Sequence, residues 1–388
     1  MITTINNKHK KLNVPNKGNA IRNVPHLRFP EFTVEWEECK LSDLCTFFSG
    51  GTPSSSNKDF YGGDIAFIRS GELHADSTEL FITQAGFESS SAKMVEVGDL
   101  LLAMYGATSG DIAISKIEGA INQAILCIKT KYNKKFIESV WNKHVSKILR
   151  KYLQGGQGNL SADIVKGISF SFPTLAEQER IANFMSLLDE RISTQTKIIE
   201  DLKKLESAIS NNLFKGINGE VVMLSEICEI TKGKQINGEN LSESGKYYVM
   251  NGGTEPSGYY SDYNVEANTI SISEGGNSCG YVQFNTSPFW SGGHCYTIQK
   301  IADNVDNLYL YHYLKSQEDA IMKLRIGSGL PNIQKKDLAM FKIKIPTLEQ
   351  QTKISTFLSS LKRKVEIEEM SLNAMKKEKQ YLLRQMFI

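Results

Sequence analysis

Glycine-rich polar segments recur in both halves of this 388-residue chain, for example "GGTPSSSNKDFYGG" (Gly50–Gly63) and "EGGNSCGY" (Glu274–Tyr281). They combine hydroxyl, amide, tyrosine and scattered basic side chains with backbone N–H groups. Groups of this kind can hold phosphates and hydrogen-bond to base edges. Any single segment is most simply a surface turn, so the interpretation depends on recurrence in both halves. The candidate nucleic-acid contacts are Thr52, Ser54, Ser55, Asn57, Lys58, Arg69, Tyr105, Thr108, Ser109, Gln157 and Asn159 in the first half, and Lys232, Lys234, Gln235, Asn251, Thr254, Tyr259, Asn277, Ser278, Tyr281, His294, Arg325, Ser328 and Asn332 in the second.

Residue patterns typical of catalysis are weak. The six cysteines form no CxxC pair, and Cys279, His294 and Cys295 match no common zinc spacing. For that cluster, a packing role is a simpler interpretation than a metal site or a catalytic nucleophile. The chain has no Pro-Pro, which an amino-methyltransferase motif would need, and no GxxxxGK[ST] phosphate loop. We therefore expect no catalytic residue, no metal and no cofactor in this chain.

Composition limits the class of protein further. The net charge is only +2, which by itself does not indicate a nucleic-acid-binding protein. Residues 1–30, however, hold six Lys or Arg and no acidic residue, so this leader is either a solvated tail or a basic arm near phosphate. No run of 18 apolar residues and no secretory signal is present, and the cysteines are scattered. These features predict a cytoplasmic protein that does not enter a membrane.

The elements that must position the polar segments are duplicated. "PTLAEQERIANFMSLLDERI" (Pro173–Ile192) and "PTLEQQTKISTFLSSLKRKV" (Pro346–Val365) are 173 residues apart and share eight of 20 positions. "KLSDLCTFFSGG" matches "MLSEICEITKGK" at an offset of 183, and "GQGNLS" matches "GLPNIQ" at 173. Each half therefore has similar ends and a divergent middle, with a length difference of about ten residues between the halves.

The repeated segments begin long helices. Thr174 with Glu177, and Thr347 with Gln350, have the spacing of a capping box. Apolar residues then recur at spacings of three and four without Gly or Pro, which predicts two helices of about 42 residues, or about 60 Å. A narrow apolar stripe needs a partner helix, and the simplest partner is the other copy. The alternative is that each stripe packs only on its own domain.

The divergent middles predict strands. "GDIAFIRS", "GDLLLAMYGA" and "NTISISEGG" are short apolar or β-branched runs bounded by turn residues. Residues 133–154 are predicted to form the helix of the first middle, with 307–324 as the counterpart. The predicted fold class is α+β: two strand-rich globular domains in a pseudo-two-fold tandem repeat, separated by two long antiparallel coiled-coil helices. The expected boundaries are 1–23 for the basic leader, 24–172 for the first domain, 173–215 for the central helix, 216–345 for the second domain and 346–388 for the C-terminal helix.

Two similar frames with divergent inserts suit a ligand with two related parts at a fixed distance. Duplex DNA is such a ligand, because its backbone is two-fold symmetric while its sequence need not be. An alternative is a structural coiled-coil adaptor with protein-binding end domains. Salt-dependent DNA affinity discriminates between the two, since an adaptor would show none.

Several motifs together resemble the specificity subunit of type I restriction-modification systems. They are "VPHLRFPEF", "LSDLCTFFSGGTPS", "GDIAFI", "GDLLLAMYGATSG", "GAINQAI" and the duplicated "PTLxxQ" helix starts, and they cover essentially residues 24–388. The resemblance implies two target-recognition domains, a helical spacer and no catalysis in this subunit. It also implies double-stranded DNA with a bipartite target, two adenine-methyltransferase subunits and motor-nuclease subunits as partners. S-adenosylmethionine, ATP and Mg are then expected on those partners.

Overall fold

The computed structural model describes residues 23–153, 159–327, 329 and 331–388. The predicted leader therefore lies outside the described residues, except for Asn23. The chain forms two compact units. The first contains the described residues up to Ser193 together with Asn373–Ile388, and the second contains Thr194–Leu372. Each unit holds one strand-rich domain and part of each long helix, so these units group the chain differently from the predicted domains, whose boundaries stay predictions.

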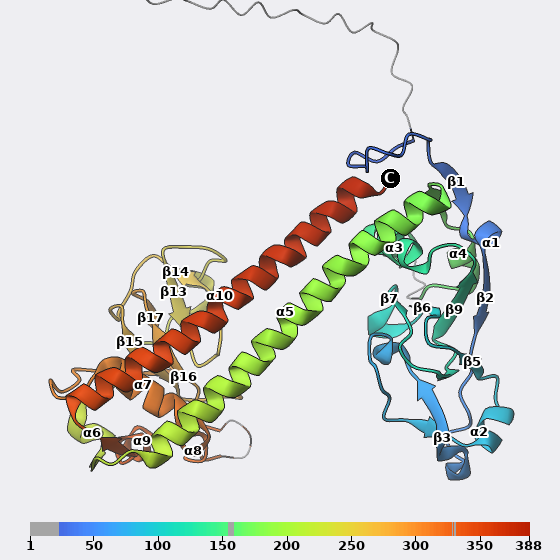
Figure 1. The fold of residues 1–388 in the computed structure, drawn as a ribbon. Coiled ribbons are helices and arrows are strands. Elements are labelled where there is room, and N and C mark those ends of the chain that lie inside the picture. The colour runs from blue at the N-terminus through green and yellow to red at the C-terminus, as the bar shows by residue number, and fades with distance from the viewer. Residues whose placement is uncertain (1–22, 154–158, 328, 330) are drawn as a thin grey trace, which may run out of the picture. The chain divides into compact units, whose positions relative to one another are not determined.

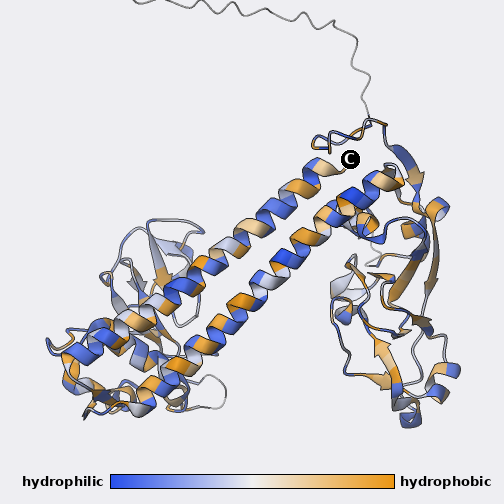
Figure 2. Cartoon of the chain, in the orientation of Figure 1, coloured by the Kyte–Doolittle hydropathy of each residue, from blue (hydrophilic) through white to orange (hydrophobic). Residues whose placement is uncertain are grey.

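The two long helices are α5 (Leu175–Gly216) and α10 (Leu348–Met386), drawn in green and red in Figure 1. In the first unit Asp189 of α5 forms an ion pair with Lys379 of α10. In the second unit the Lys203 ammonium lies 2.6 Å from the Glu369 carboxylate. The beginning of α5 thus meets the end of α10 in one unit, and the converse holds in the other. The predicted antiparallel pairing is confirmed, and both helices alternate hydrophobic and hydrophilic patches along their length (Figure 2).

The predicted capping boxes form in part. The Thr174 and Thr347 hydroxyls each accept a 3.4 Å hydrogen bond from the backbone N–H three residues later. The Glu177 carboxylate instead accepts 2.7 Å hydrogen bonds from the Arg28 guanidinium. The final glutamine of each "PTLxxQ" motif is buried and donates back to the proline carbonyl that precedes the helix.

The first domain contains three sheets. Strands β1 (Glu37–Lys40) and β10 (Ser169–Phe172) pair antiparallel next to the start of α5. The other two sheets have the strand orders β2-β9-β6-β7 and β4-β3-β8-β5. Their strands are β2 (Cys45–Ser49), β3 (Tyr61–Ile68), β4 (Phe81–Ile82), β5 (Lys93–Val95), β6 (Leu100–Ala103), β7 (Ile112–Ile114), β8 (Gly119–Ile121) and β9 (Ile125–Thr130). The short helices are α1 (Leu41–Leu44), α2 (Gln84–Glu88) and α4 (Ala162–Lys166), with 3-10 turns at Lys58–Phe60, Ser70–Glu72 and Gly106–Thr108.

The second domain repeats this topology. Strands β11 (Glu220–Met223) and β19 (Lys342–Ile345) pair antiparallel, and the other sheets have the orders β12-β18-β15-β16 and β14-β13-β17. Here β3 and β8 of the first domain correspond to β13 and β17, and both pairs are parallel. The divergent middles therefore keep most of one topology, and the counterpart of β5 is reduced to a single bridge between Val265 and Phe289. The strands are β12 (Glu229–Lys232), β13 (Tyr247–Met250), β14 (Tyr259–Tyr260), β15 (Thr269–Ser273), β16 (Val282–Asn285), β17 (Trp290–Ser291) and β18 (Cys295–Gln299), with short helices α6 (Leu224–Ile227) and α9 (Lys335–Ala339) and a 3-10 turn at Gly238–Asn240.

The helix that follows β9 in the first domain differs from the one that follows β18 in the second. In the first domain α3 (Lys134–Leu153) agrees with the predicted 133–154. The predicted single helix 307–324 is wrong: α7 (Asn307–Ser316) and α8 (Glu318–Met322) are separate. The break falls at Gln317, which adopts φ −103° and ψ 13°. The Glu318 carboxylate beyond the break accepts from the Val282 N–H at 2.8 Å, which ties α8 to β16.

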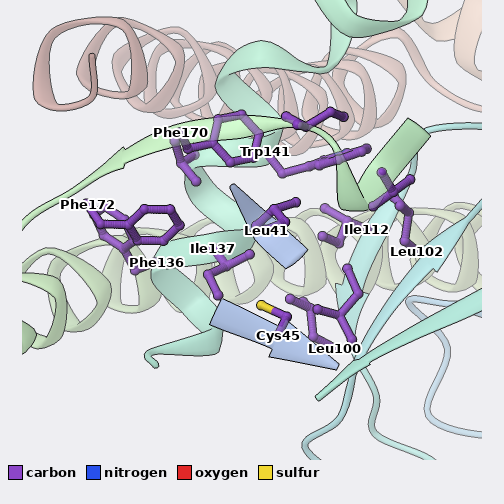
Figure 3. Close-up of a cluster of buried hydrophobic side chains, with 14 of the residues drawn as sticks. Leu41, Cys45, Leu100, Leu102, Ile112, Phe136, Ile137, Trp141, Phe170 and Phe172 are labelled. Carbon is purple, nitrogen blue, oxygen red and sulfur yellow. The ribbon is translucent and has the colours of Figure 1, made fainter. Parts of the chain in front are cut away.

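A large apolar core supports the first domain (Figure 3). Trp141 of α3 is fully buried, and its indole N–H donates to the Gly110 carbonyl at 2.8 Å. Leu100, Leu102 and Ile112 from β6 and β7 belong to the same cluster. This core fixes the position of the chain segment between β6 and β7, where several candidate residues lie.

Candidate nucleic-acid interface

The candidate residues lie mainly at one edge of the sheet β2-β9-β6-β7 in the first domain and of the sheet β12-β18-β15-β16 in the second. Strands β2 and β6 both pair antiparallel with β9, so both end where β9 begins. The segments 50–57, 104–110 and 122–124 therefore meet at that edge of the first domain. Strands β12, β15 and β18 have the same arrangement, so 233–237, 274–280 and 292–294 meet in the second. We refer to these two sets of residues as the loop edges of the domains.

The loop 104–110, between β6 and β7, and the loop 274–280, between β15 and β16, have the same backbone. Gly106 and Gly276 have φ values of 75° and 76°, and Gly110 and Gly280 have 88° and 96°. Each loop closes through the N–H of its last glycine, which donates to the carbonyl of Ala103 at 2.8 Å or Ser273 at 2.9 Å. A numbering offset of 170 relates the two loops, since Leu102 pairs with Ile112 and Ile272 pairs with Val282.

A fourth segment joins each loop edge. The Leu160 N–H donates to the Met104 carbonyl at 3.0 Å, and the Ile333 N–H donates to the Glu274 carbonyl at 2.8 Å. The matched sequences "GNL" and "PNI" therefore place Asn159 and Asn332 beside equivalent loops. Both asparagines are exposed.

Several candidates of the first domain are exposed or half-buried at its loop edge. The Thr52 hydroxyl donates to the Gln123 side-chain carbonyl at 2.5 Å, which joins two of the loops. The Ser109 hydroxyl instead donates to the Met104 carbonyl at 2.9 Å and stabilises the turn itself. The remaining candidates in these loops are Ser54, Ser55, Lys58, Tyr105 and Thr108, of which Tyr105 also packs against the core.

The second loop edge gathers a comparable set. The Asn251 side-chain carbonyl accepts from the His294 N–H at 3.1 Å, so the segment after β13 reaches the same edge. The Lys234 N–H donates to the Ser291 carbonyl at 2.8 Å, while its side chain is exposed. The other candidates here or in the adjoining segments are Gln235, Thr254, Asn277, Ser278 and Arg325.

Five further candidates also have structural partners. Arg69 forms a 2.8 Å ion pair with Glu72, and Lys232 forms a 2.6 Å ion pair with Glu274. The Asn57 side chain accepts from the Asp59 N–H, Tyr259 lies within β14, and the Tyr281 ring lies 4.0 Å from the Lys315 ammonium. Gln157 and Ser328 lie outside the described residues.

Glu274 is the residue that sequence analysis missed. It is 7% exposed, and its carboxylate accepts from the Lys232 ammonium and, at 3.0 Å, from the Tyr296 hydroxyl. Burial and the adjacent Glu274 raise the pKa of Tyr296 well above its usual range, so this hydroxyl stays a neutral donor. The offset of 170 places Met104 at the equivalent position of the first domain. An acidic residue opposite a methionine, in loops that share both glycines, was the available signal.

The cysteines near this edge are poor nucleophiles. The Cys279 thiol donates to the Glu274 carbonyl at 3.0 Å, and burial raises its pKa. Burial also raises the pKa of Cys295 to about 11. Neither thiol is ionised at neutral pH, so the nucleophile hypothesis gains no support.

Within the described part of the chain, no set of three or more His, Cys, Asp or Glu side chains has a metal-binding arrangement. No helix within it is both long and apolar enough to cross a membrane.

Comparison with known proteins identifies the family. Residues 33–204 and 217–377 match the model of the type I restriction modification DNA specificity domain. The chain belongs to the type I restriction-modification DNA specificity family. It is a specificity subunit with two recognition domains, a non-catalytic member of a type I complex that recognises target DNA.

Individual relatives agree. The MjaVIII type I restriction enzyme specificity subunit of Methanocaldococcus jannaschii is 23% identical over 402 residues, 92% of each chain. A protein described as a type I specificity subunit of Mycoplasma pneumoniae is 34% identical over 145 residues, 37% of this chain and 38% of that protein. The fold is similar to the crystal structure of the specificity subunit from M. genitalium, with a TM-score of 0.66, 18% identity and coverage of 94% of this chain and 99% of that chain.

Proposed function

We propose that each globular domain reads one half of a bipartite DNA target through its loop edge. The duplicated backbone of the loops 104–110 and 274–280 carries this proposal, because it presents different side chains from the same frame. Exposed Thr, Asn, Gln and Lys side chains at both edges suit phosphate contacts and base-edge hydrogen bonds. The DNA-contact roles of the candidate residues are part of this proposal.

The paired helices α5 and α10 set the spacing between the two half-sites and bind the partner subunits. Leu187 and Tyr381 in the first unit are 65% and 60% exposed, and Leu205 and Met370 in the second are 51% and 57% exposed. Large apolar side chains on the open faces of polar helices suit contact with other subunits. The partners are two methyltransferase subunits, which bind S-adenosylmethionine, and motor-nuclease subunits, which bind ATP and Mg. The assembly acts on double-stranded DNA in the cytoplasm.

Exchange of residues 224–345 for the corresponding segment of a relative tests the division between half-sites. The exchanged segment begins at α6 and ends with β19, so it carries the second domain between its helix junctions. We expect the assembled methyltransferase to change its preference at one half-site and to keep the other. The readout is the set of methylated sequences, and a change in both halves would contradict the proposal.

A coiled-coil adaptor with protein-binding end domains remains the alternative to test. DNA affinity of the assembled complex should fall steeply as salt rises if Lys and Arg side chains displace counterions from phosphates. Salt-independent or absent binding would favour the adaptor. The matched control is the methyltransferase assembled with a relative's complete specificity subunit.

A further inference from the structure

The loop edge of the second domain contains a charged cluster. Lys232, at the end of β12, lies 2.6 Å from Glu274 Oε1. The Tyr296 hydroxyl approaches the same oxygen at 3.0 Å. His294 lies in the turn before β18, and its Nδ1 is 3.6 Å from Glu274 Oε2. The Lys232 and His294 side chains are 51% and 63% exposed, whereas the Glu274 side chain is 9% exposed.

The first domain has a different set of residues at the same positions. Glu274 corresponds to Met104, His294 to Ala124 and Tyr296 to Leu126, all at the offset of 170. Ser49 takes the place of Lys232, because Ser49 pairs with Leu126 as Lys232 pairs with Tyr296. The shared fold therefore does not require the cluster.

One oxygen in the cluster lacks a hydrogen bond. Glu274 Oε2 is buried and has no partner within hydrogen-bonding distance. The 3.6 Å separation from His294 Nδ1 is beyond that distance. A buried, unpaired carboxylate oxygen is unfavourable, so a small rotation of the exposed His294 ring that closes this gap is favoured. The His294 side chain is 63% exposed, so a ligand can reach its other ring nitrogen, Nε2.

We propose that Lys232 and His294, positioned by Glu274, form a binding site for a DNA phosphate on the second domain, and that phosphate binding is coupled to protonation of His294. The proposal rests on the proposed DNA recognition by this domain. With Nδ1–H donated to Glu274, the ring can donate from Nε2 only when it is protonated. A phosphate oxygen is the acceptor that favours this form, because the Lys232 and Glu274 charges cancel and the added proton leaves a net positive charge.

The surrounding groups are consistent with this coupling. Glu274 faces His294 directly, Lys232 does so through Glu274, and Tyr296 remains a neutral hydroxyl. Asn251 holds the His294 backbone N–H, and Lys234 and Arg325 are exposed cations in neighbouring segments. Histidine side chains change charge between about pH 5 and pH 8. DNA affinity should therefore rise as the pH falls through this range, since binding takes up a proton.

The test measures the dissociation constant of the assembled methyltransferase complex for target DNA from pH 5.5 to 8.5 at fixed ionic strength. For the native chain we expect a tightening of up to about tenfold per pH unit, the limit for one proton. His294→Gln should remove this slope and leave only the pH dependence that other groups of the complex contribute. Glu274→Gln should reduce it as well and should bind more tightly than the native chain at pH 8.5, because a negative charge is lost. Lys234→Ala is the control. It should reduce the slope of log affinity against log salt concentration by about one and keep the native slope against pH.

An unchanged slope in His294→Gln, or a native slope in Glu274→Gln, would overturn the proposal. A slope that depends on the identity of one base pair would also overturn it, because a phosphate contact acts on all sequences alike. If Glu274→Gln does not fold, the NMR titration of His294 in the native complex with and without DNA gives the same answer: DNA must raise the pH of its transition. A complex that binds no target DNA would instead refute the proposed function.

Discussion

The loop between β6 and β7 and the loop between β15 and β16 have the same backbone and different chemistry. In both, glycines with positive φ occupy the third and seventh positions, and the same internal N–H groups and carbonyls are joined. Met104 and Ala107 nevertheless correspond to Glu274 and Asn277. Backbone hydrogen bonds hold most of each loop, and Ser109 and Cys279 donate to the first carbonyl of their own loop. The other side chains can therefore differ without altering its shape. The comparison explains how one frame can serve two different half-sites.

The strongest way to break the shared frame is to add a side chain where the loops meet. A Cβ at Gly50 would lie 1.7 Å from the Ile121 carbonyl oxygen, and one at Gly233 would lie 2.2 Å from the Gly292 carbonyl oxygen. Gly50→Ala and Gly233→Ala should each destabilise their own domain by about 3 kcal/mol. Gly71→Ala and Gly238→Ala are controls, because nothing lies within 4 Å of the added Cβ. Denaturant unfolding measures the effect, and equal stabilities of test and control variants would contradict this account.

The next largest difference concerns the glutamines at the two helix starts. Gln351 donates to the carbonyls of Pro346 and Asn304 at 3.0 Å and accepts from the Asp306 N–H at 2.8 Å. Gln178 donates to Pro173 at 2.9 Å, and its buried Oε1 has no partner. At about 1 kcal/mol for each hydrogen bond, Gln351→Ala should cost about 3 kcal/mol and Gln178→Ala about 1 kcal/mol. Equal losses in the free energy of unfolding would show that the matched motifs have equal roles.

These glutamines show what the sequence could and could not predict. The duplicated "PTLxxQ" segments correctly predicted both long helices and their antiparallel pairing, because capping and apolar spacing are local signals. The glutamine's role depends on Asn304 and Asp306, which are remote in sequence from Gln351, and no local pattern shows this contact. The sequence does not show the break at Gln317 for a similar reason. The Glu318 carboxylate just after the break accepts a hydrogen bond from the Val282 N–H of β16, which is remote in sequence.

The candidate interface was predictable to a similar extent. The recurrence of polar, Gly-rich segments in both halves pointed to these residues, whereas the meeting of the loops at one edge follows from the strand pairing. The loops placed Asn277 and Lys234 on an exposed surface, but the ion pair of Lys232 with a buried Glu274 required the fold. DNA contacts of individual residues stay predictions.

Acid should affect the second unit through His312. Asn133 and Asp306 cap α3 and α7, which places Ser139 and His312 at equivalent positions. Burial lowers the pKa of His312 to about 4, whereas an unfolded histidine titrates near 6.5. The stability contributed by neutral His312 is complete above about pH 6.5 and is lost as the pH falls toward 4. At pH 5 the free energy of unfolding has fallen by about 2 kcal/mol on this account. In His312→Gln, the free energy of unfolding should change less between about pH 4 and pH 6.5 than it does in the native chain. If both proteins lose the same stability over this range, His312 is not the source of the pH dependence.

The smallest expected effect tests the side-chain difference directly. Asn277 and Ala107 are both exposed in the matched loops, and only the asparagine amide can pair with the N6 and N7 groups of adenine. Asn277→Ala should cost about 1 kcal/mol at one base position of the second half-site and leave the first half-site unchanged. Ala107→Asn, the reciprocal variant, should introduce a new preference at one position of the first half-site if the two frames approach DNA alike. Methylation rates on targets with single-base changes measure both effects. A uniform loss across all targets in Asn277→Ala would assign this residue to the phosphate backbone, and the equivalence of the two loops in base reading would be wrong.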